Sequence, residues 1–489
     1  MKTIYFGFLA MILPTLSLAQ TTAVQDSIPE IQLEEVKLAG LRIDEDQPFS
    51  FSNVDKEELA SRNLGQDLPI MLNYLPGVVT TSDAGAGIGY SGIRVRGSDA
   101  TRVNVTINGI PYNDAESQGV YWVNMPDFTS SVSSLQIQRG VGTSTNGSGA
   151  FGASINLLTD EVSQNAYAEI ANTVGSFNSL KHTLKFSTGL LNNRFEISGR
   201  LSKITSNGYV ERASSDLKSY FLQAAFQDEN TLIKALVFGG HEITYQSWFG
   251  VDKNTLDTNR QYNPAGEIYD DNGNLEGHYD NQEDNYRQDH YQLHWNQKID
   301  AYTSLSLGLN YTYGRGYYEE YKDLWFEQNI NFSSDNNFSY LGLKPIKIGG
   351  TIIDTTENIV RKWLDNDYYV ATFSLNRQKG NTEWSFGTLY SRYVGDHFGE
   401  LIFAHYAPSI SLRHRFYENQ GNKKEGNVYA KVNHRFNDRI SGYLDLQYRG
   451  ISYTADGKLK GPEPINIDEN YGFFNPKAGL VYTLNPNNK

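Results

Sequence analysis

The sequence predicts a small mixed α+β domain followed by a long antiparallel transmembrane β-barrel. Three observations predict this fold class. The chain opens with the three regions of an export signal. It continues with a glycine-rich segment of short elements, and from about residue 165 it changes to long strands in which apolar and polar residues alternate.

The first nineteen residues have the features of a signal peptide. Lys2 supplies the positive start, Ile4 to Leu13 form the apolar core, and Ser17 to Ala19 form a small-residue cleavage site. The apolar core is too short to cross a bilayer as a helix, and no later run of about 18 apolar residues occurs. The sequence therefore predicts an exported protein without a transmembrane helix.

Composition excludes several classes of function. The 489 residues include 42 basic and 56 acidic side chains, and the net charge of −14 argues against nucleic acid as a partner. The absence of cysteine excludes a disulfide framework and a thiolate metal site. The 33 tyrosines and 24 phenylalanines fit either a large β-core or the aromatic girdles of a membrane barrel.

Residues 49–160 are expected to form the α+β domain, after a polar segment at 20–48. Asp55 to Ala60 has the acidic first turn of a helix, and Leu68 to Leu75 predicts a second helical turn or two, which Pro76-Gly77 ends. Short strands are expected at 93–95, 103–107 and 135–137. The domain closes with the glycine-rich run Arg139 to Thr159, whose apolar end predicts a last strand.

Period-two alternation predicts about twelve strands in the rest of the chain. In Arg194–Leu201, for example, the apolar residues share one face and the polar residues share the other. The expected strands are 166–174, 179–189, 193–204, 217–227, 231–242, 286–298, 302–313, 366–377, 382–394, 426–436, 439–452 and 472–484.

The predicted connections alternate in length. Tight turns are expected at 190–192, 228–230, 299–301, 378–381 and 437–438, and long loops at 243–285, 314–365, 395–425 and 453–471. Short turns on one rim and long loops on the other are typical of outer-membrane barrels. A soluble β-sandwich is the alternative reading of the strand pattern, but its loops are not sorted in this way.

Five motifs of the α+β domain resemble those of TonB-dependent outer-membrane receptors, in order and in spacing. They are Leu75-Pro76-Gly77-Val78, Ile93-Arg94-Val95-Arg96-Gly97, Val105 to Pro111, Gln138-Arg139-Gly140 and Gly147 to Asn156. The resemblance implies a plug domain at 49–160 inside a barrel that begins at 161. It also implies that Leu33-Glu34-Glu35-Val36-Lys37-Leu38 is a TonB box, which pairs as a strand with an inner-membrane energy transducer of the TonB type.

Three plug arginines stand out under this resemblance: Arg94, Arg96 and Arg139. A solvated surface is the ordinary role of any one arginine. Inside a barrel, however, a buried guanidinium group needs a carboxylate partner. The resemblance implies that the three arginines pair with barrel glutamates and hold the plug in place until the transducer pulls.

The number of strands is smaller than the resemblance implies. Barrels that enclose a plug have about 22 strands. The sequence shows about 12 of the expected 22. The chain is therefore expected to be a C-terminally truncated form of a longer reading frame.

The expected ligand is a scarce iron chelate. The plug segment Glu116 to Asp127 is similar to that of ferric-citrate and siderophore receptors of the Bacteroidetes type. The segment 20–48 leaves no room for the extra domains of glycan importers or signalling receptors. The candidate ligand contacts are exposed aromatic residues of the plug and the long loops: Tyr121, Trp122, Trp248, Tyr317, Tyr318 and Trp325.

Other readings of the sequence remain. Cobalamin, a glycan or another metal chelate could be the ligand, and the chain could be a passive receptor or adhesin, or a truncated product that does not transport. The run Gly87 to Gly92 fits a dinucleotide fingerprint by letter, but no helix follows it. His290 and His294 share a strand face and could meet a metal, although a place in the barrel lining is favoured. No enzyme, catalytic residue, cofactor or metal site is expected; outer-membrane lipid is the expected surrounding.

Overall fold

The computed structural model describes residues 42–43, 47–145, 150–408, 410–459 and 461–484. The predicted signal peptide at 1–19 and the predicted TonB box at 33–38 lie outside the described residues, as does most of the segment 20–48. Within the described part of the chain, the two main sheets are one of five strands in the N-terminal domain and one of twelve strands, and three two-stranded sheets accompany them.

The N-terminal domain is built from short elements, as the sequence predicts. Their bounds are β1 Ser50–Asp55, α1 Lys56–Arg62, α2 Leu68–Met71, β2 Val78–Ser82, β3 Ser91–Val95, η2 Ala100–Arg102, β4 Val103–Ile107, β5 Ile110–Pro111, η3 Trp122–Asn124, η4 Phe128–Ser131, β6 Val132–Arg139 and β7 Ala153–Thr159. The main sheet has the order β1-β6-β7-β4-β5, and β2 pairs with β3 in a separate hairpin. β4 and β7 run parallel, so the apolar end of the glycine-rich run becomes an inner strand of the domain.

Local chemistry fixes the helices and the core of this domain. The Asp55 carboxylate caps α1 by accepting a hydrogen bond of 2.9 Å from the Glu58 amide. Ile155 and Leu157 on β7 are fully buried and pack with β4 and β6 residues such as Leu135. The strands expected at 93–95, 103–107 and 135–137 are confirmed.

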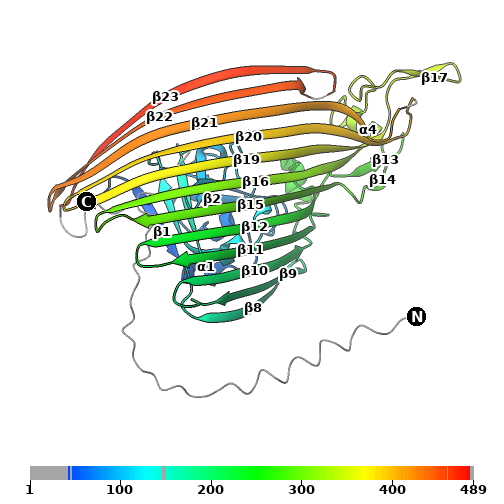
Figure 1. Cartoon of the computed structure of the whole chain (residues 1–489). Coiled ribbons are helices and arrows are strands. Elements are labelled where there is room, and N and C mark those ends of the chain that lie inside the picture. The colour runs from blue at the N-terminus through cyan, green and yellow to red at the C-terminus, as the bar shows by residue number, and fades with distance from the viewer. Residues whose placement is uncertain (1–41, 44–46, 146–149, 409, 460, 485–489) are drawn as a thin grey trace. The chain divides into compact units, whose positions relative to one another are not determined.

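All twelve strands expected after residue 165 are confirmed. They are β8 Ala166–Gly175, β9 Ser179–Thr188, β10 Phe195–Ser206, β11 Ser215–Gln227, β12 Thr231–Tyr245, β15 Glu283–Lys298, β16 Thr303–Lys322, β19 Asn358–Lys379, β20 Thr382–Ala404, β21 His414–Asn437, β22 Ile440–Lys458 and β23 Pro464–Tyr482. Each strand pairs with the next one along the chain and runs antiparallel to it. The order of the strands in the sheet is therefore their order in the sequence (Figure 1). The expected total of 22 strands is not reached in the described residues and stays a prediction.

The long connections differ from those predicted. The loops expected at 395–425 and 453–471 are wrong, because most of these residues lie in paired strands. β20 and β21 stay paired as far as Leu401 and its partner His414. β22 and β23 stay paired as far as Lys458 and its partner Pro464. Apolar and polar residues alternate only where one face of a strand meets lipid and the other faces the barrel interior. Where both faces meet water, this alternation is lost, although the backbone hydrogen bonds between the strands continue. The two remaining loops contain short elements: α3 Lys253–Thr258, β13 Glu267–Tyr269, β14 Leu275–His278, α4 Leu324–Asn329, β17 Ile346–Ile348 and β18 Thr351–Ile353.

Burial along the strands is inverted relative to a soluble protein. On β9, Lys181 and Thr183 are buried, whereas Leu184 and Phe186 on the opposite face are exposed. On the same apolar side of the sheet, the rings of Tyr291, Tyr311 and Tyr369 stack on one another across three strands. Apolar residues outside and polar residues inside are the pattern of a membrane barrel. No helix in the described residues is long and apolar enough to cross a bilayer.

The N-terminal domain packs against the polar face of the large sheet. Gly240 on β12 allows a close approach of the two backbones, because a Cβ at this position would lie 2.5 Å from the carbonyl oxygen of Asn124. Nearby, Phe128 contacts the rings of Phe221 and Phe238 of the sheet. The apolar core of the domain thus continues into the sheet at this point.

Candidate functional site

A cavity of about 660 Å³ lies between the N-terminal domain and the large sheet. The domain contributes polar and aromatic residues from two segments: Tyr90, Tyr112, Asp114, Glu116, Ser117, Tyr121 and Asn124. The sheet and its connections contribute Glu242, Trp248, Asp284, Tyr286, Gln288, Gly316, Tyr317, Tyr318, Glu320, Lys362, Trp363, Leu364, Tyr393, His397 and Tyr417. A molecule in this cavity therefore contacts both parts of the chain.

Hydrogen bonds hold the domain segment that lines the cavity. The Asn113 side chain donates to the carbonyls of Val103 (2.9 Å) and Gln118 (2.8 Å) and accepts from the Val105 amide (2.7 Å). Asp114 accepts hydrogen bonds from the Ser117 amide and hydroxyl, at 2.6 and 2.8 Å. The loop is thus anchored to β4, and its side chains are presented by a fixed backbone.

Glu116 connects this loop to two strands of the large sheet, β20 and β22. Its Oε2 lies 2.7 Å from Nε2 of His397 and accepts from the Tyr393 hydroxyl at 3.0 Å, and its Oε1 accepts from the Tyr453 hydroxyl at 2.9 Å. The Lys423 ammonium donates to the carbonyl of Ala115, at 2.6 Å. Burial alone would raise the pKa of Glu116, but the hydrogen bond and charge of His397, with the two tyrosines, hold this pKa below its ordinary value.

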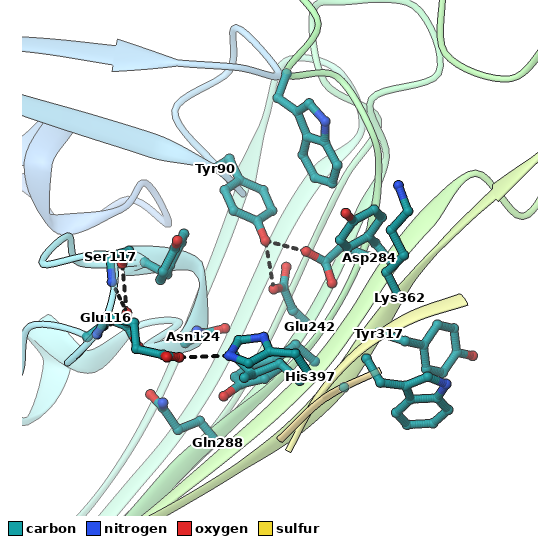
Figure 2. Close-up of a pocket in the computed structure, with 18 of the residues that line it drawn as sticks. Tyr90, Glu116, Ser117, Asn124, Glu242, Asp284, Gln288, Tyr317, Lys362 and His397 are labelled. Atoms are coloured by element: carbon teal, nitrogen blue, oxygen red, sulfur yellow. Dashed lines mark hydrogen bonds and ion pairs between the residues drawn. The ribbon is translucent and has the colours of Figure 1, made fainter. Parts of the chain in front are cut away.

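Tyr90 reaches two carboxylates on the opposite wall of the cavity, as Figure 2 shows. Its hydroxyl donates to Oδ2 of Asp284 and lies 3.3 Å from Oε1 of Glu242. Burial, together with the negative charge of Glu242 and Asp284, raises the pKa of Tyr90 well above its ordinary value, so the hydroxyl keeps its proton.

Aromatic rings form the rest of this wall. Trp248 meets Tyr90 edge to face with ring centroids 5.4 Å apart, and Tyr318 with centroids 6.2 Å apart. Tyr317 packs on Trp363 at 4.6 Å. Such rings offer stacking surfaces and the negative faces that attract cations.

Negative groups outnumber positive groups in the lining. Among the described residues, the carboxylates are Asp114, Glu116, Glu242, Asp284 and Glu320, and the basic side chains are Lys362 and His397. Glu320 pairs with Lys362 at 2.9 Å and with Lys322 at 3.3 Å.

The structure divides the predicted aromatic contacts into two groups. Tyr121, Trp248, Tyr317 and Tyr318 line the cavity. Trp122 instead belongs to the core of the N-terminal domain and is 3% exposed. Trp325 lies on α4, where its ring packs against Tyr269 at 4.9 Å, away from the lining.

Sequence reasoning missed the polar residues of the cavity, namely Tyr90, Glu116, Asn124, Glu242 and Asp284. Glu116 and Asn124 lie in the segment Glu116 to Asp127 that the sequence singled out, and Glu242 and Asp284 lie near the ends of β12 and β15 at the long-loop rim. Tyr90 lies inside the rejected glycine motif, where its role could not be read locally.

The three plug arginines lie apart from this cavity. Arg94 and Arg96 are exposed, and Arg139 is buried, donating to the carbonyl of Pro76 at 3.0 Å and to the Ser52 hydroxyl at 2.9 Å. Within the described residues none of the three forms an ion pair, so their pairing with barrel glutamates stays a prediction.

The charge pairs seen between domain and sheet have the opposite polarity. Asp127 of the domain is fully buried and pairs with Lys181 of β9 at 2.6 Å and Arg200 of β10 at 3.4 Å. Asp160, just after β7, pairs with Lys185 of β9 at 2.5 Å. Burial opposes ionisation of Asp127, but Arg200 and Lys181 hold its pKa well below the ordinary value.

His290 and His294 are both buried and hydrogen-bonded. His290 Nδ1 lies 2.9 Å from the Thr312 hydroxyl, and His294 Nε2 lies 3.0 Å from the Gln292 side chain. In the part of the chain that the structure describes, no group of three or more histidine, aspartate or glutamate residues could hold a metal ion.

Comparisons with known proteins agree with this architecture. The model of the TonB-dependent receptor plug domain matches residues 44–154, and the model of the TonB-dependent receptor-like β-barrel matches residues 225–489. No curated protein sequence matches the chain.

Solved structures show the same fold at low sequence identity. The unliganded ferric citrate transporter FecA is 14% identical with a TM-score of 0.66, over 90% of this chain and 61% of its own. The ferric yersiniabactin receptor FyuA of Yersinia pestis is 13% identical (TM-score 0.63; 90% and 62% covered), and the ferric-catecholate receptor Fiu of E. coli K12 is 13% identical (TM-score 0.62; 90% and 68% covered). The chain thus spans about three fifths of the length of FecA and FyuA.

Proposed function

The chain belongs to the TonB-dependent receptor family, and from this premise we propose that it imports a scarce iron chelate, a ferric siderophore or ferric citrate, across the outer membrane. The family consists of transport receptors, and its β-barrels are outer-membrane proteins. The observation that carries the proposal is the 660 Å³ cavity, which plug and barrel line together. A ligand held by both parts is positioned to report its presence to the plug.

The chelate class is supported by the neighbours and by the lining. The structures named above are receptors for ferric citrate, ferric yersiniabactin and ferric catecholates. Tyr121, Trp248, Tyr317 and Tyr318 give the cavity the flat aromatic surfaces that suit a bulky chelate. Cobalamin or a glycan would use similar surfaces, so these ligands are outcomes of the test below.

Energy for import is proposed to come from a TonB-type transducer in the inner membrane. The segment 33–38 would add a strand to the transducer, and main-chain hydrogen bonds would give the affinity. Residues 1–19 would direct export as a signal peptide.

Further strands are proposed to complete the barrel wall. In the described residues, β8 and β23 are the two edges of the large sheet. Unpaired backbone groups in lipid cost several kcal/mol each, so both edges need partners in the membrane. The expectation of about 22 strands follows from this requirement and from the presence of a plug.

Uptake of radioactive iron by cells that carry the complete receptor gene tests the proposal. A panel of ferric chelates, cobalamin and oligosaccharides identifies the ligand class. Deletion of residues 33–38 should abolish uptake while surface binding of the ligand persists. Uptake that survives this deletion would support a passive receptor, and the absence of uptake of any ferric chelate would refute the iron proposal.

A further inference from the structure

We infer that the cavity recognises a positively charged, hydrogen-bond-donating group of its ligand, an organic ammonium held by Glu242, Asp284 and Asn124 beside the ring of Trp248. The inference rests on the proposed function, since it takes the cavity to be the ligand site. It names the chemical class of ligand that this site selects.

The Tyr90 hydroxyl faces two carboxylates with a single proton. It is hydrogen-bonded to Asp284 and lies 3.3 Å from Glu242, yet it has only one proton to donate. Glu242 is 1% exposed, and its other oxygen accepts from the Thr244 hydroxyl at 3.2 Å. The two oxygens that face the Tyr90 hydroxyl therefore share its one proton, and the oxygen that does not receive it can accept from a ligand donor or meet a cation.

Asn124 also has an unsatisfied side-chain acceptor. This residue is 8% exposed and lines the same cavity, and its side-chain oxygen Oδ1 has no hydrogen-bond partner. Figure 2 places Asn124 among the lining side chains, on the side of Glu116. A buried acceptor without a donor is costly, and a ligand with a donor group satisfies it.

Both basic side chains of the lining are already paired with other carboxylates. Lys362 forms an ion pair with Glu320, and His397 contacts the carboxylate of Glu116. Among the described residues, no basic side chain forms an ion pair with Glu242 or Asp284. Of the lining carboxylates, Asp114, Glu242 and Asp284 thus have no basic partner among the described residues, and the last two face Tyr90.

The lining suits an organic cation better than a metal ion. The described residues hold no cluster of three or more metal-ligating side chains, so a resident metal has too few ligands here. The ring centroid of Trp248 lies 5.4 Å from that of Tyr90 and 6.2 Å from that of Tyr318. Aromatic faces beside carboxylates attract an alkylammonium group, whereas the negative charge of ferric citrate meets repulsion.

Paired probes test the inference on the complete receptor in detergent. The first pair is ferrioxamine B, a ferric trihydroxamate with one free ammonium group, and its N-acetylated form, which lacks that charge. The second pair is iron-free: 1,5-diaminopentane and its N,N′-diacetylated form, which has no ammonium group. Ferric citrate is the anionic probe. Binding is measured by equilibrium dialysis and by quenching of tryptophan fluorescence.

The expected result is a preference of about tenfold or more for the ammonium form in at least one pair, with ferric citrate weaker than ferrioxamine B. The double variant Glu242→Gln/Asp284→Asn keeps the shape of both side chains and should lose this preference. The matched control is Asp216→Asn, the same chemical change outside the cavity lining, in the exposed pair of Asp216 with Lys203, and it should retain the preference. Circular dichroism and heat-dependent gel mobility check that each variant is folded.

The outcomes separate this inference from the proposed function. Equal binding of both members in both pairs, or a preference that persists in the double variant, overturns the ammonium site. Tight binding of ferric citrate that the double variant does not change also overturns it, while leaving the iron proposal intact. Preference within the iron-free pair alone, without binding of any ferric chelate, supports the ammonium site and refutes the iron proposal.

Discussion

Replacement of Asp127 by asparagine should loosen the plug from the barrel wall. The carboxylate faces Lys181 and Arg200 and accepts hydrogen bonds from the hydroxyls of Thr183 (2.7 Å) and Ser202 (2.5 Å), and all of these groups are buried. Asparagine keeps the size of the side chain and tolerates the left-handed backbone of this residue, whose φ is 53°. The substitution therefore keeps the shape, removes the charge and replaces one acceptor oxygen by an NH2 donor, which cannot accept from the neighbouring donors.

The magnitude follows from the burial of the two cations. Removing one partner of a buried ion pair typically costs about 3–5 kcal/mol, because the remaining charge stays desolvated without compensation. The matched control is Asp216→Asn, the same chemical change in the exposed pair of Asp216 with Lys203 (3.1 Å). An exposed pair contributes about 0–1 kcal/mol, so this control should have little effect.

A single label can follow the plug because the chain contains no cysteine. Val79→Cys places a thiol on an exposed position of β2, and a fluorophore there reports urea unfolding of the plug in the detergent-solubilised receptor. A shift no larger in Asp127→Asn than in Asp216→Asn would refute the reasoning. Because the folded-state pKa of Asp127 is lowered, its contribution is present at neutral pH and is lost as the pH falls below about 4 toward that pKa. Asparagine should remove this acid-dependent part.

Three further predictions concern the plug. Burial raises the pKa of Asp67 to about 8, above the ordinary value of about 3.9. The free energy of unfolding should therefore fall as the pH rises between these two values, by up to about 1.4 kcal/mol per pH unit. Equal pH slopes of the unfolding free energy in Asp67→Asn and in the parent protein would contradict this. Glu116→Gln should weaken the contact with His397 and lower plug stability by about 1–3 kcal/mol, seen as an earlier urea midpoint; an unchanged midpoint would show that the contact is dispensable. Trp122→Ala should cost about 3–5 kcal/mol as a core truncation, whereas Tyr121→Ala, 45% exposed, should chiefly weaken ligand binding; equal urea midpoints for the two variants would contradict the assignment.

Local sequence patterns were sufficient for the strands and for much of the plug. A lipid-exposed strand must show apolar residues at every second position, and this constraint acts on each strand independently of its neighbours. Helix α1 was likewise predictable, since its cap, Asp55, lies within the same few residues. The family resemblance, too, depends on short motifs with fixed spacing, and two family models confirm it.

The same reasoning failed where the local constraint ends. Segments 395–404 and 414–425 continue as paired strands, although they show no regular alternation. Backbone hydrogen bonds to a neighbouring strand hold them, and such bonds leave no mark on side-chain chemistry. Strand length above the membrane is therefore a property of the pair of strands.

By itself, the sequence determined the order of the strands, the faces they show to lipid and the family of the chain, because each of these is written in residues a few positions apart. Only the tertiary structure decided which charges meet. Glu116 and Tyr453 are 337 residues apart in the chain, and Tyr90 and Asp284 are 194 apart. Ion pairs and cavities are formed by groups that folding brings within a few ångströms, and their strength depends on a burial that no local pattern records.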